Sequence, residues 1–133
     1  MDSLSLEPDP AAVRDARRFV RDHCVAAQNS PDLCDDAVLL ASEVVTNAFT
    51  HGRSEARLGV DAHPGRIHVE VSDDNSRHPQ MQDDDGDALD GRGLRILDRV
   101  ARRWGVRDDA FGKTVWFDLE AAAAPAVVDL RHH

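Results

Sequence analysis

The chain has 133 residues, which is enough for one domain with a hydrophobic core but not comfortably for two. Hydrophobic residues make up 41% and charged residues 31% of the sequence, a composition typical of globular proteins. The formal net charge is −9, whereas proteins that bind nucleic acids or anionic membranes are usually basic, so both of these classes are disfavoured.

The N-terminal part is predicted to form a short strand and then a helix. Residues 3–7 alternate between polar and apolar side chains, and prolines at positions 8 and 10 end this strand. Residues 11–27 repeat apolar side chains with a helical period. The predicted buried residues of this helix are Val13, Ala16, Val20 and Cys24. Its opposite face carries the arginine row Arg14, Arg17, Arg18 and Arg21.

The same region indicates a cytoplasmic protein. Cys24 and Cys34 lack the spacing of a metal or redox motif, so buried free thiols are favoured over a single disulfide. Acidic residues near the N-terminus interrupt any apolar run, and no stretch reaches the ~20 apolar residues of a membrane span. We therefore expect a cytoplasmic location and no contact with a membrane.

A second helix is predicted over residues 33–50, after the helix-start signals at positions 29–32. Gly52 is predicted to cap its C-terminus. The predicted buried stripe of this helix consists of Leu33, Ala37, Leu40, Val44 and Ala48.

The remaining elements are two hairpins and a third helix. Residues 56–60 and 67–71 alternate around a turn at 63–66, residues 94–103 are predicted to be helical, and residues 104–107 and 113–119 form the second hairpin. The order β-α-α-β-β-α-β-β predicts an α+β fold, a two-layer α/β sandwich. Its sheet is expected to be mixed, mostly antiparallel and covered on one face by helices. We predict one domain over residues 1–120 and a tail over 121–133.

The negative charge is concentrated between the first hairpin and the third helix. Residues 73–90 hold seven aspartates and one arginine, which gives this segment a formal charge of −6. It is predicted to form a long loop.

Polar side chains follow the edge of the buried stripe on the second helix. Glu43, Asn47 and His51 are spaced by four residues, so they share one face and lie one turn from each other. A carboxylate, an amide and an imidazole in such a row indicate the wall of a pocket, although an ordinary helix flank would show the same spacing.

Asp73 continues the inward alternation of the strand before it, so its side chain is predicted to point to the buried face at the strand's end. A buried carboxylate is costly unless it is hydrogen-bonded. It could accept a hydrogen bond from a ligand donor such as an exocyclic amino group, or it could cap backbone N–H groups in the following turn.

Two glycine-containing segments complete the set. Gly91-Arg92-Gly93-Leu94 opens a helix, whose N-terminus presents backbone N–H groups suited to phosphate, although a flexible loop end has the same composition. Gly112-Lys113-Thr114 is typical of a hairpin turn. Its Thr114 hydroxyl could reach a base-binding site if this strand neighbours the Asp73 strand.

In this order, the four segments resemble the motifs of the GHKL superfamily of histidine-kinase-like ATPases, and more closely the small anti-sigma-factor serine kinases of bacteria and their single-domain actinobacterial relatives. Residues 43–52 are similar to the N box, Val71-Ser72-Asp73 to the start of the next box, and residues 91–94 and 112–114 to the two later boxes. The resemblance covers residues 4–120 and implies the Bergerat-type ATP-binding fold.

The resemblance implies ATP and Mg²⁺ as cofactors and assigns a role to each motif. Glu43 would be the general base, and Asn47 would hold the Mg²⁺ that bridges the ATP phosphates. Asp73, assisted by Thr114, would accept a hydrogen bond from the adenine amino group. His51 and the backbone of Gly91, Gly93 and Leu94 would contact the phosphates, and Asn75 and Arg92 complete the expected ATP-binding set.

By this resemblance, the protein would sequester a sigma factor and phosphorylate a serine of an anti-sigma antagonist. The arginine rows, of which the third helix carries a second at positions 92, 95, 99 and 102, would suit an acidic protein partner, or they are simply solvated faces. A homodimer is possible by analogy with these kinases, and direct contact with nucleic acid is not expected. Half of a split histidine kinase is disfavoured, since the chain has no room for the dimerising helices.

Asn75 and Arg77 stand where the family has glycines, so a non-catalytic ATP-binding interaction module in transcriptional or developmental regulation is the alternative function. The dense acidic segment would repel a triphosphate folded against it. We therefore expect Asp83 to Asp90 to point to solvent or to a partner, with Asp73 alone turned inward.

Overall fold

The computed structural model describes residues 1–52, 55–73, 101–109 and 112–121. The strands in these ranges are β1 (Asp2–Leu6), β2 (Ala56–His63), β3 (Arg66–Asp73), β4 (Arg103–Asp109) and β5 (Gly112–Glu120). The helices are α1 (Pro10–Ala26) and α2 (Pro31–Gly52). No helix in this part of the chain is both long and apolar enough to cross a membrane.

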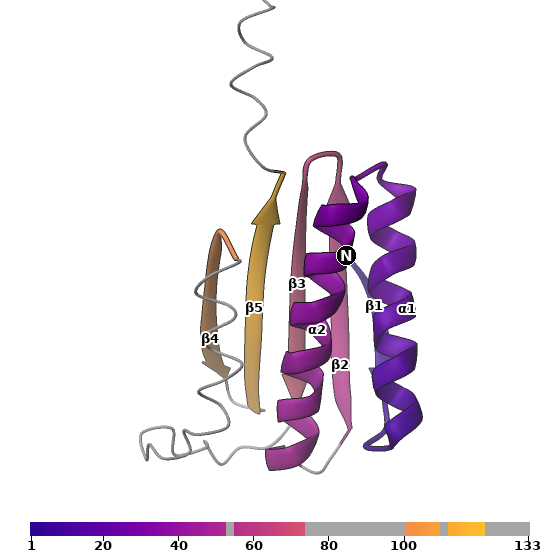
Figure 1. Ribbon diagram of the computed structural model, residues 1–133. Coiled ribbons are helices and arrows are strands. Elements are labelled where there is room, and N and C mark those ends of the chain that lie inside the picture. The colour runs from indigo at the N-terminus through magenta and orange to yellow at the C-terminus, as the bar shows by residue number, and fades with distance from the viewer. Residues whose placement is uncertain (53–54, 74–100, 110–111, 122–133) are drawn as a thin grey trace, which may run out of the picture.

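The five strands form one sheet in the order β1-β2-β3-β5-β4, and α1 and α2 lie side by side on the same face of it (Figure 1). Helix α1 packs over β1 and β2, and α2 packs mainly over β3. This arrangement confirms the predicted α/β sandwich. Every pair among these strands is antiparallel, because β5 lies between β3 and β4, which run in the same direction.

Side-chain caps set the helix starts. The Asp9 carboxylate accepts a hydrogen bond from the Ala11 N–H at 2.7 Å, and the Ser30 hydroxyl accepts one from the Leu33 N–H at 3.1 Å. The predicted end of α2 was wrong by two residues, since Gly52 belongs to the helix and does not cap it. The Thr50 hydroxyl donates to the Thr46 carbonyl at 2.9 Å, a bond made within a helix, and the chain continues helically beyond it.

The core lies between the two helices and the sheet. The predicted stripe of α2 is buried in full, and α1 buries Ala16, Val20 and Cys24. Val13 is only half-buried, and Ala12 takes its place against the core. Cys24 and Cys34 are free and buried, as predicted. Burial and the neighbouring Cys34 raise the pKa of Cys24 to about 12, so this thiol stays protonated at neutral pH.

The register of the strands decides which side chains reach the helices. On β3, Ile67, Val69 and Val71 point to the face covered by α1 and α2, which we call the helix face. His68 and Glu70 point to the opposite side, which we call the open face.

The third predicted helix lies mostly outside the described residues. Its predicted last residue, Arg103, instead begins β4 and pairs with Asp118 of β5. The second hairpin is longer than predicted, because Asp108 and Gly112 are strand residues and not part of the turn. The predicted acidic loop and C-terminal tail also fall outside the described residues, apart from Asp73 and Ala121.

Candidate nucleotide-binding site

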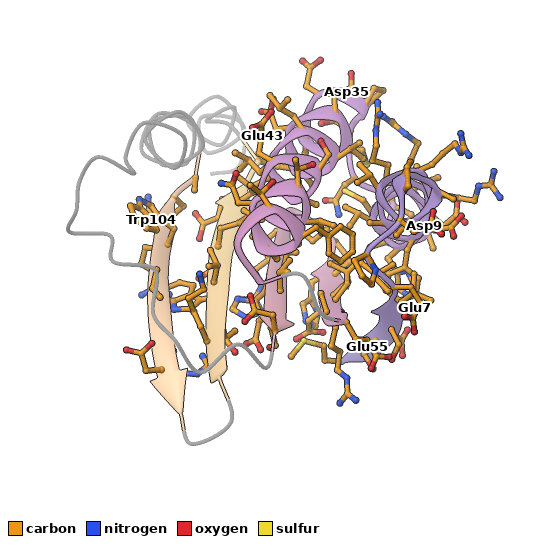
Figure 2. All side chains as sticks on the ribbon, turned by 90° about the horizontal axis from the view of Figure 1, so that it is seen from below. Glu7, Asp9, Asp35, Glu43, Glu55 and Trp104 are labelled. Carbon is orange, nitrogen blue, oxygen red and sulfur yellow. The ribbon has the colours of Figure 1, made fainter. Side chains whose placement is uncertain are left out.

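Helix α2 carries the first part of the candidate site. Glu43 and Asn47 are half-buried and lie one turn apart, about 6 Å along the helix axis. Figure 2 shows Glu43 on the side of α2 that faces away from α1. Neither side chain forms a hydrogen bond or ion pair in the part of the chain that the structure describes. His51 belongs to the last turn of α2, one turn beyond Asn47.

Asp73 supplies a carboxylate at the end of β3. It points to the helix face and is 8% exposed, as its position in the alternation predicted. Asp73 pairs with Ala56, the first residue of β2, and β2 begins shortly after α2 ends at Gly52. Asp73 therefore lies at the end of the sheet where α2 ends, and the polar row of α2 runs toward it.

Thr114 lies on the other side of the sheet. Strand β5 neighbours β3, as the prediction required, but the register pairs Thr114 with Ser72 and not with Asp73. Residues paired across antiparallel strands share a face. The Thr114 side chain is therefore on the open face, where its hydroxyl lies 2.8 Å from that of Ser72. The structure does not bring Thr114 to the Asp73 carboxylate.

Lys113 occupies the place that was predicted for Thr114. It pairs with Asp73 in the register and shares the helix face with it. Inward-pointing Phe117 and Leu119 already indicated this, because alternation along β5 puts Lys113 on the same side as they are.

Several predicted site residues lie outside the described residues. They are Asn75, Gly91, Arg92, Gly93 and Leu94, together with the aspartates 83–90. Their assignments remain predictions.

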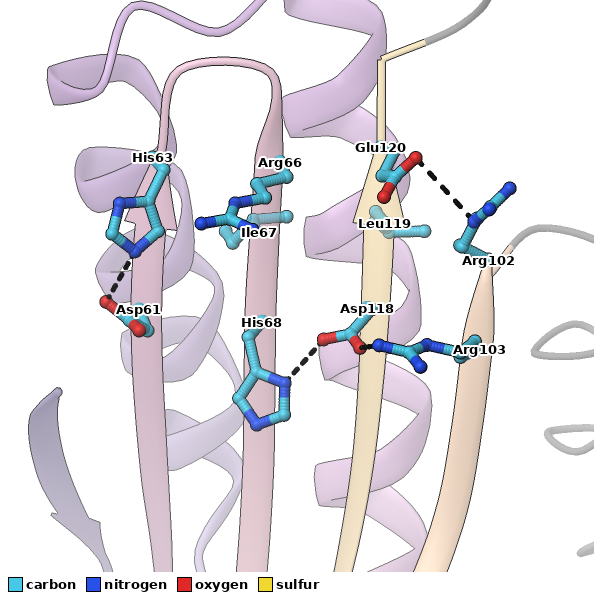
Figure 3. Close-up of a pocket in the computed structure, with 10 residues that line it drawn as sticks. All are labelled: Asp61, His63, Arg66, Ile67, His68, Arg102, Arg103, Asp118, Leu119 and Glu120. Atoms are coloured by element: carbon cyan, nitrogen blue, oxygen red, sulfur yellow. Dashed lines mark hydrogen bonds and ion pairs between the residues drawn. The ribbon is translucent and has the colours of Figure 1, made fainter.

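A polar pocket of about 170 Å³ lies on the open face, among residues of β2, β3, β4 and β5 (Figure 3). Its basic side chains include Arg66, Arg102 and Arg103, and the last two pair with Glu120 and Asp118 at 3.6 and 3.5 Å. Because Asp73 points to the helix face, this pocket is separate from the candidate site.

His68 is the centre of a charge network beside this pocket. Its ring nitrogens lie 2.5 Å from an Asp118 oxygen and 2.8 Å from a Glu70 oxygen. Ionised carboxylates only accept hydrogen bonds, and both ring nitrogens donate only in the imidazolium form, so this arrangement favours the imidazolium. Arg103 and Arg107 contact the same two carboxylates from β4. Alternating charges thus connect three neighbouring strands.

Trp116 packs beside the network on the open face. Its ring is stacked on that of His68, with centroids 5.9 Å apart and planes 26° apart. Gly105 lies opposite Trp116 in the register, and a Cβ at this position would meet the indole at 2.9 Å. A side chain at residue 105 would therefore displace the tryptophan.

The network predicts a pH-dependent contribution to stability. Burial lowers the pKa of His68, but the hydrogen bonds to Glu70 and Asp118 outweigh this and raise it above its ordinary value. The contribution should therefore be complete below about pH 6.5, the ordinary histidine pKa, and should be lost as the pH rises through the raised pKa. We expect His68→Gln to reduce the free energy of unfolding at pH 6 by on the order of 1 kcal/mol, and by less at pH 9.

Urea unfolding at several pH values measures this difference. The control is His63→Gln, which removes a more exposed imidazole from β2 with one carboxylate partner, Asp61, and should change the pH dependence less than His68→Gln does. An equal loss at pH 6 and pH 9 in His68→Gln would contradict the assigned charge state. Asp61 lies opposite His68 on β2, and Asp61→Asn should change the dependence less than Asp118→Asn, because Asp61 pairs with His63.

A comparison with known protein families finds a family model that covers most of the chain. Residues 6–119 match the family model of the histidine kinase-like ATPase domain. The matched range contains Glu43, Asn47, Asp73 and Lys113. A comparison with curated proteins gave no match.

Proposed function

This chain belongs to the histidine kinase-like ATPase domain family, and a domain of this family implies an ATP-binding site. We propose that the protein is an ATP- and Mg²⁺-binding regulator of the anti-sigma-factor serine kinase type. In this role it sequesters a sigma factor and phosphorylates a serine of an anti-sigma antagonist. It acts in the cytoplasm on protein partners, with no direct nucleic-acid contact.

The observation that carries the proposal is the position of Asp73. A carboxylate that is 8% exposed points to the helix face, at the end of the sheet toward which Glu43 and Asn47 run on α2. An ionised carboxylate has about four acceptor sites, so beside the interaction that Asp73 already makes it can accept a hydrogen bond from an exocyclic amino group. We assign Asp73 to the adenine amino group.

The residues of α2 fit the phosphate end of the nucleotide. The amide oxygen of Asn47 is the kind of hard oxygen ligand that Mg²⁺ prefers, and this side chain has no other hydrogen bond among the described residues. When bound, Mg²⁺ neutralises charge on the phosphates. His51, in the last turn of α2, and the 91–94 segment are the further phosphate contacts in this proposal.

Glu43 is the general base of the proposed reaction. The serine hydroxyl of the antagonist loses its proton to the Glu43 carboxylate while its oxygen forms a bond to the terminal phosphorus of ATP. The bond from that phosphorus to the bridging oxygen breaks, and ADP leaves. Glu43 is half-buried and lies one turn from Asn47, and in this proposal its carboxylate accepts the proton beside the terminal phosphate.

The outer face of α1 carries a row of arginines that would suit an acidic protein partner. Arg14, Arg17 and Arg18 are exposed and form no ion pair among the described residues, whereas Arg21 pairs with Asp35 at 3.0 Å. Arginine suits bidentate contacts with carboxylates, and 15 of the 16 basic residues of the chain are arginine. This row is the surface that we propose for the sigma factor or the antagonist; a homodimer is compatible with it.

A second candidate function is a non-catalytic ATP-binding interaction module. Asn75 and Arg77, in place of the family's glycines, favour it because they alter the turn that follows Asp73. Incubation with ATP labelled at the terminal phosphate and with candidate antagonists separates the two functions. Labelled phosphoserine on an antagonist is expected for the kinase, whereas bound ATP without transfer to any partner would favour the module.

A further inference from the structure

Four strands contribute one row of side chains to the helix face at the end of the sheet. In the register, Ala56 of β2 lies opposite Asp73 of β3, Asp73 opposite Lys113 of β5, and Lys113 opposite Asp108 of β4. Directly paired residues of this kind have Cβ atoms about 5 Å apart. Lys113 is the single lysine of the chain, and it stands between two carboxylates.

Neutralising the charges of Asp73 and Asp108 does not by itself explain the position of Lys113. An ammonium between two aspartates could pair with either one, yet Lys113 forms no ion pair among the residues that the structure describes. Its side chain is half-buried on the face to which Asp73 points. The Lys113 side chain therefore begins next to that of Asp73 on the helix face, and its ammonium has no ion-pair partner among the described residues.

We propose that Lys113 is a specificity-determining residue, which reads the base of the nucleotide together with Asp73. This inference rests on the proposed function, because it takes the adenine amino group to lie at Asp73. The Lys113 ammonium donates a hydrogen bond to ring nitrogen N1 of adenine. The neighbouring amino group of the base donates a hydrogen bond to the Asp73 carboxylate.

The chemistry of the two side chains fits the edge of adenine. A carboxylate only accepts hydrogen bonds and an ammonium only donates them. Adenine presents a donor, its 6-amino group, beside an acceptor, N1. Guanine presents an acceptor at position 6 and a donor at position 1, which is the reverse order. In this orientation Asp73 and Lys113 select adenine and oppose guanine.

The test asks whether Lys113 contacts N1 of adenine, by changing the residue and the atom separately and together. Affinities of wild type, Lys113→Met and Lys113→Arg are measured for Mg-ATP and for Mg-1-deaza-ATP, in which a C–H group replaces N1. We expect the loss of N1 to weaken wild-type binding about tenfold, the value of one hydrogen bond to a charged group. Lys113→Met should weaken ATP binding by a similar factor and should lose nothing further with 1-deaza-ATP.

Lys113→Arg keeps a cationic donor and should retain part of the preference for N1. The matched control is Arg107→Met, which removes a positive charge from the open face near the same end of the sheet. It should bind ATP as the wild type does and should keep the full N1 effect. GTP should bind wild type at least tenfold more weakly than ATP, and Lys113→Met should narrow this gap.

The outcomes distinguish this inference from the proposed function. Equal wild-type affinity for ATP and 1-deaza-ATP, or additive effects of the base change and Lys113→Met, would overturn the role of Lys113 and leave the ATP site intact. A wild-type protein that binds neither nucleotide would overturn the proposed function and this inference with it. The wild-type comparison needs no variant, so a folding defect in Lys113→Met does not obscure the result.

Discussion

Asp73→Asn should reduce the affinity for Mg-ATP by about tenfold to a hundredfold. A charge-assisted hydrogen bond from the adenine amino group is worth about 1.5–3 kcal/mol, and tenfold corresponds to about 1.4 kcal/mol. Asparagine keeps the shape of the side chain but removes its charge and can present its own donors to the amino group. The measurement is a calorimetric titration of each protein with Mg-ATP.

The structure supplies a matched control for this variant. Asp61→Asn also removes one carboxylate from a strand of the sheet, but Asp61 lines the pocket on the open face. Its affinity for Mg-ATP should stay within about twofold of the wild type, since screening weakens the effect of distant exposed charges. Equal affinities in Asp73→Asn and wild type, with both proteins folded, would show that Asp73 does not contact the nucleotide.

Glu43→Gln should reduce phosphoryl transfer to the antagonist by about 10²–10⁴-fold, the usual contribution of a general base. Glutamine has the size of glutamate but does not accept a proton at neutral pH. Glu43 is assigned to the serine hydroxyl and contacts neither adenine nor Mg²⁺ in this proposal. The affinity for Mg-ATP should therefore change by less than about threefold. Single-turnover transfer of labelled phosphate and a parallel ATP titration measure the two effects separately.

Asp36→Asn is the control for this second variant. Asp36 is an exposed carboxylate two turns before Glu43 on the same helix. Partial burial and the nearby Asp32 and Asp35 raise the pKa of Asp36. Asp36 lies near the start of α2, far from the end of the helix that approaches Asp73. Transfer by Asp36→Asn should match the wild type. If Glu43→Gln transfers phosphate at the wild-type rate, Glu43 is not the base.

Local periodicity predicted most of the fold. The stripe of α2 is buried at every predicted position, and the two-residue alternation correctly placed Ile67, Val69 and Val71 against the helices. These patterns are visible in the sequence because a helix or strand decides by itself which side chains share a face. The same reasoning predicted the inward position of Asp73 at the end of β3.

Features that depend on pairing between distant strands could not be predicted in this way. His68 meets Asp118 on β5, 50 residues later, and only the register of the sheet shows that their side chains share the open face. The register also decides that Lys113, and not the predicted Thr114, lies opposite Asp73. The resemblance identified the segment 112–114, but a shift of one residue along a strand moves a side chain to the other face.

The binding of Mg-ATP to the wild-type protein, followed as the shift of its melting temperature, decides whether this fold holds a nucleotide site at Asp73. A ligand that binds only the native state stabilises it by an amount that grows with ligand concentration, about 2.7 kcal/mol at a hundredfold excess over Kd. We predict a saturable rise in melting temperature with Mg-ATP that is much smaller in Asp73→Asn at the same concentration. No rise in the wild type, or an equal rise in both proteins, would contradict the assignment of the site.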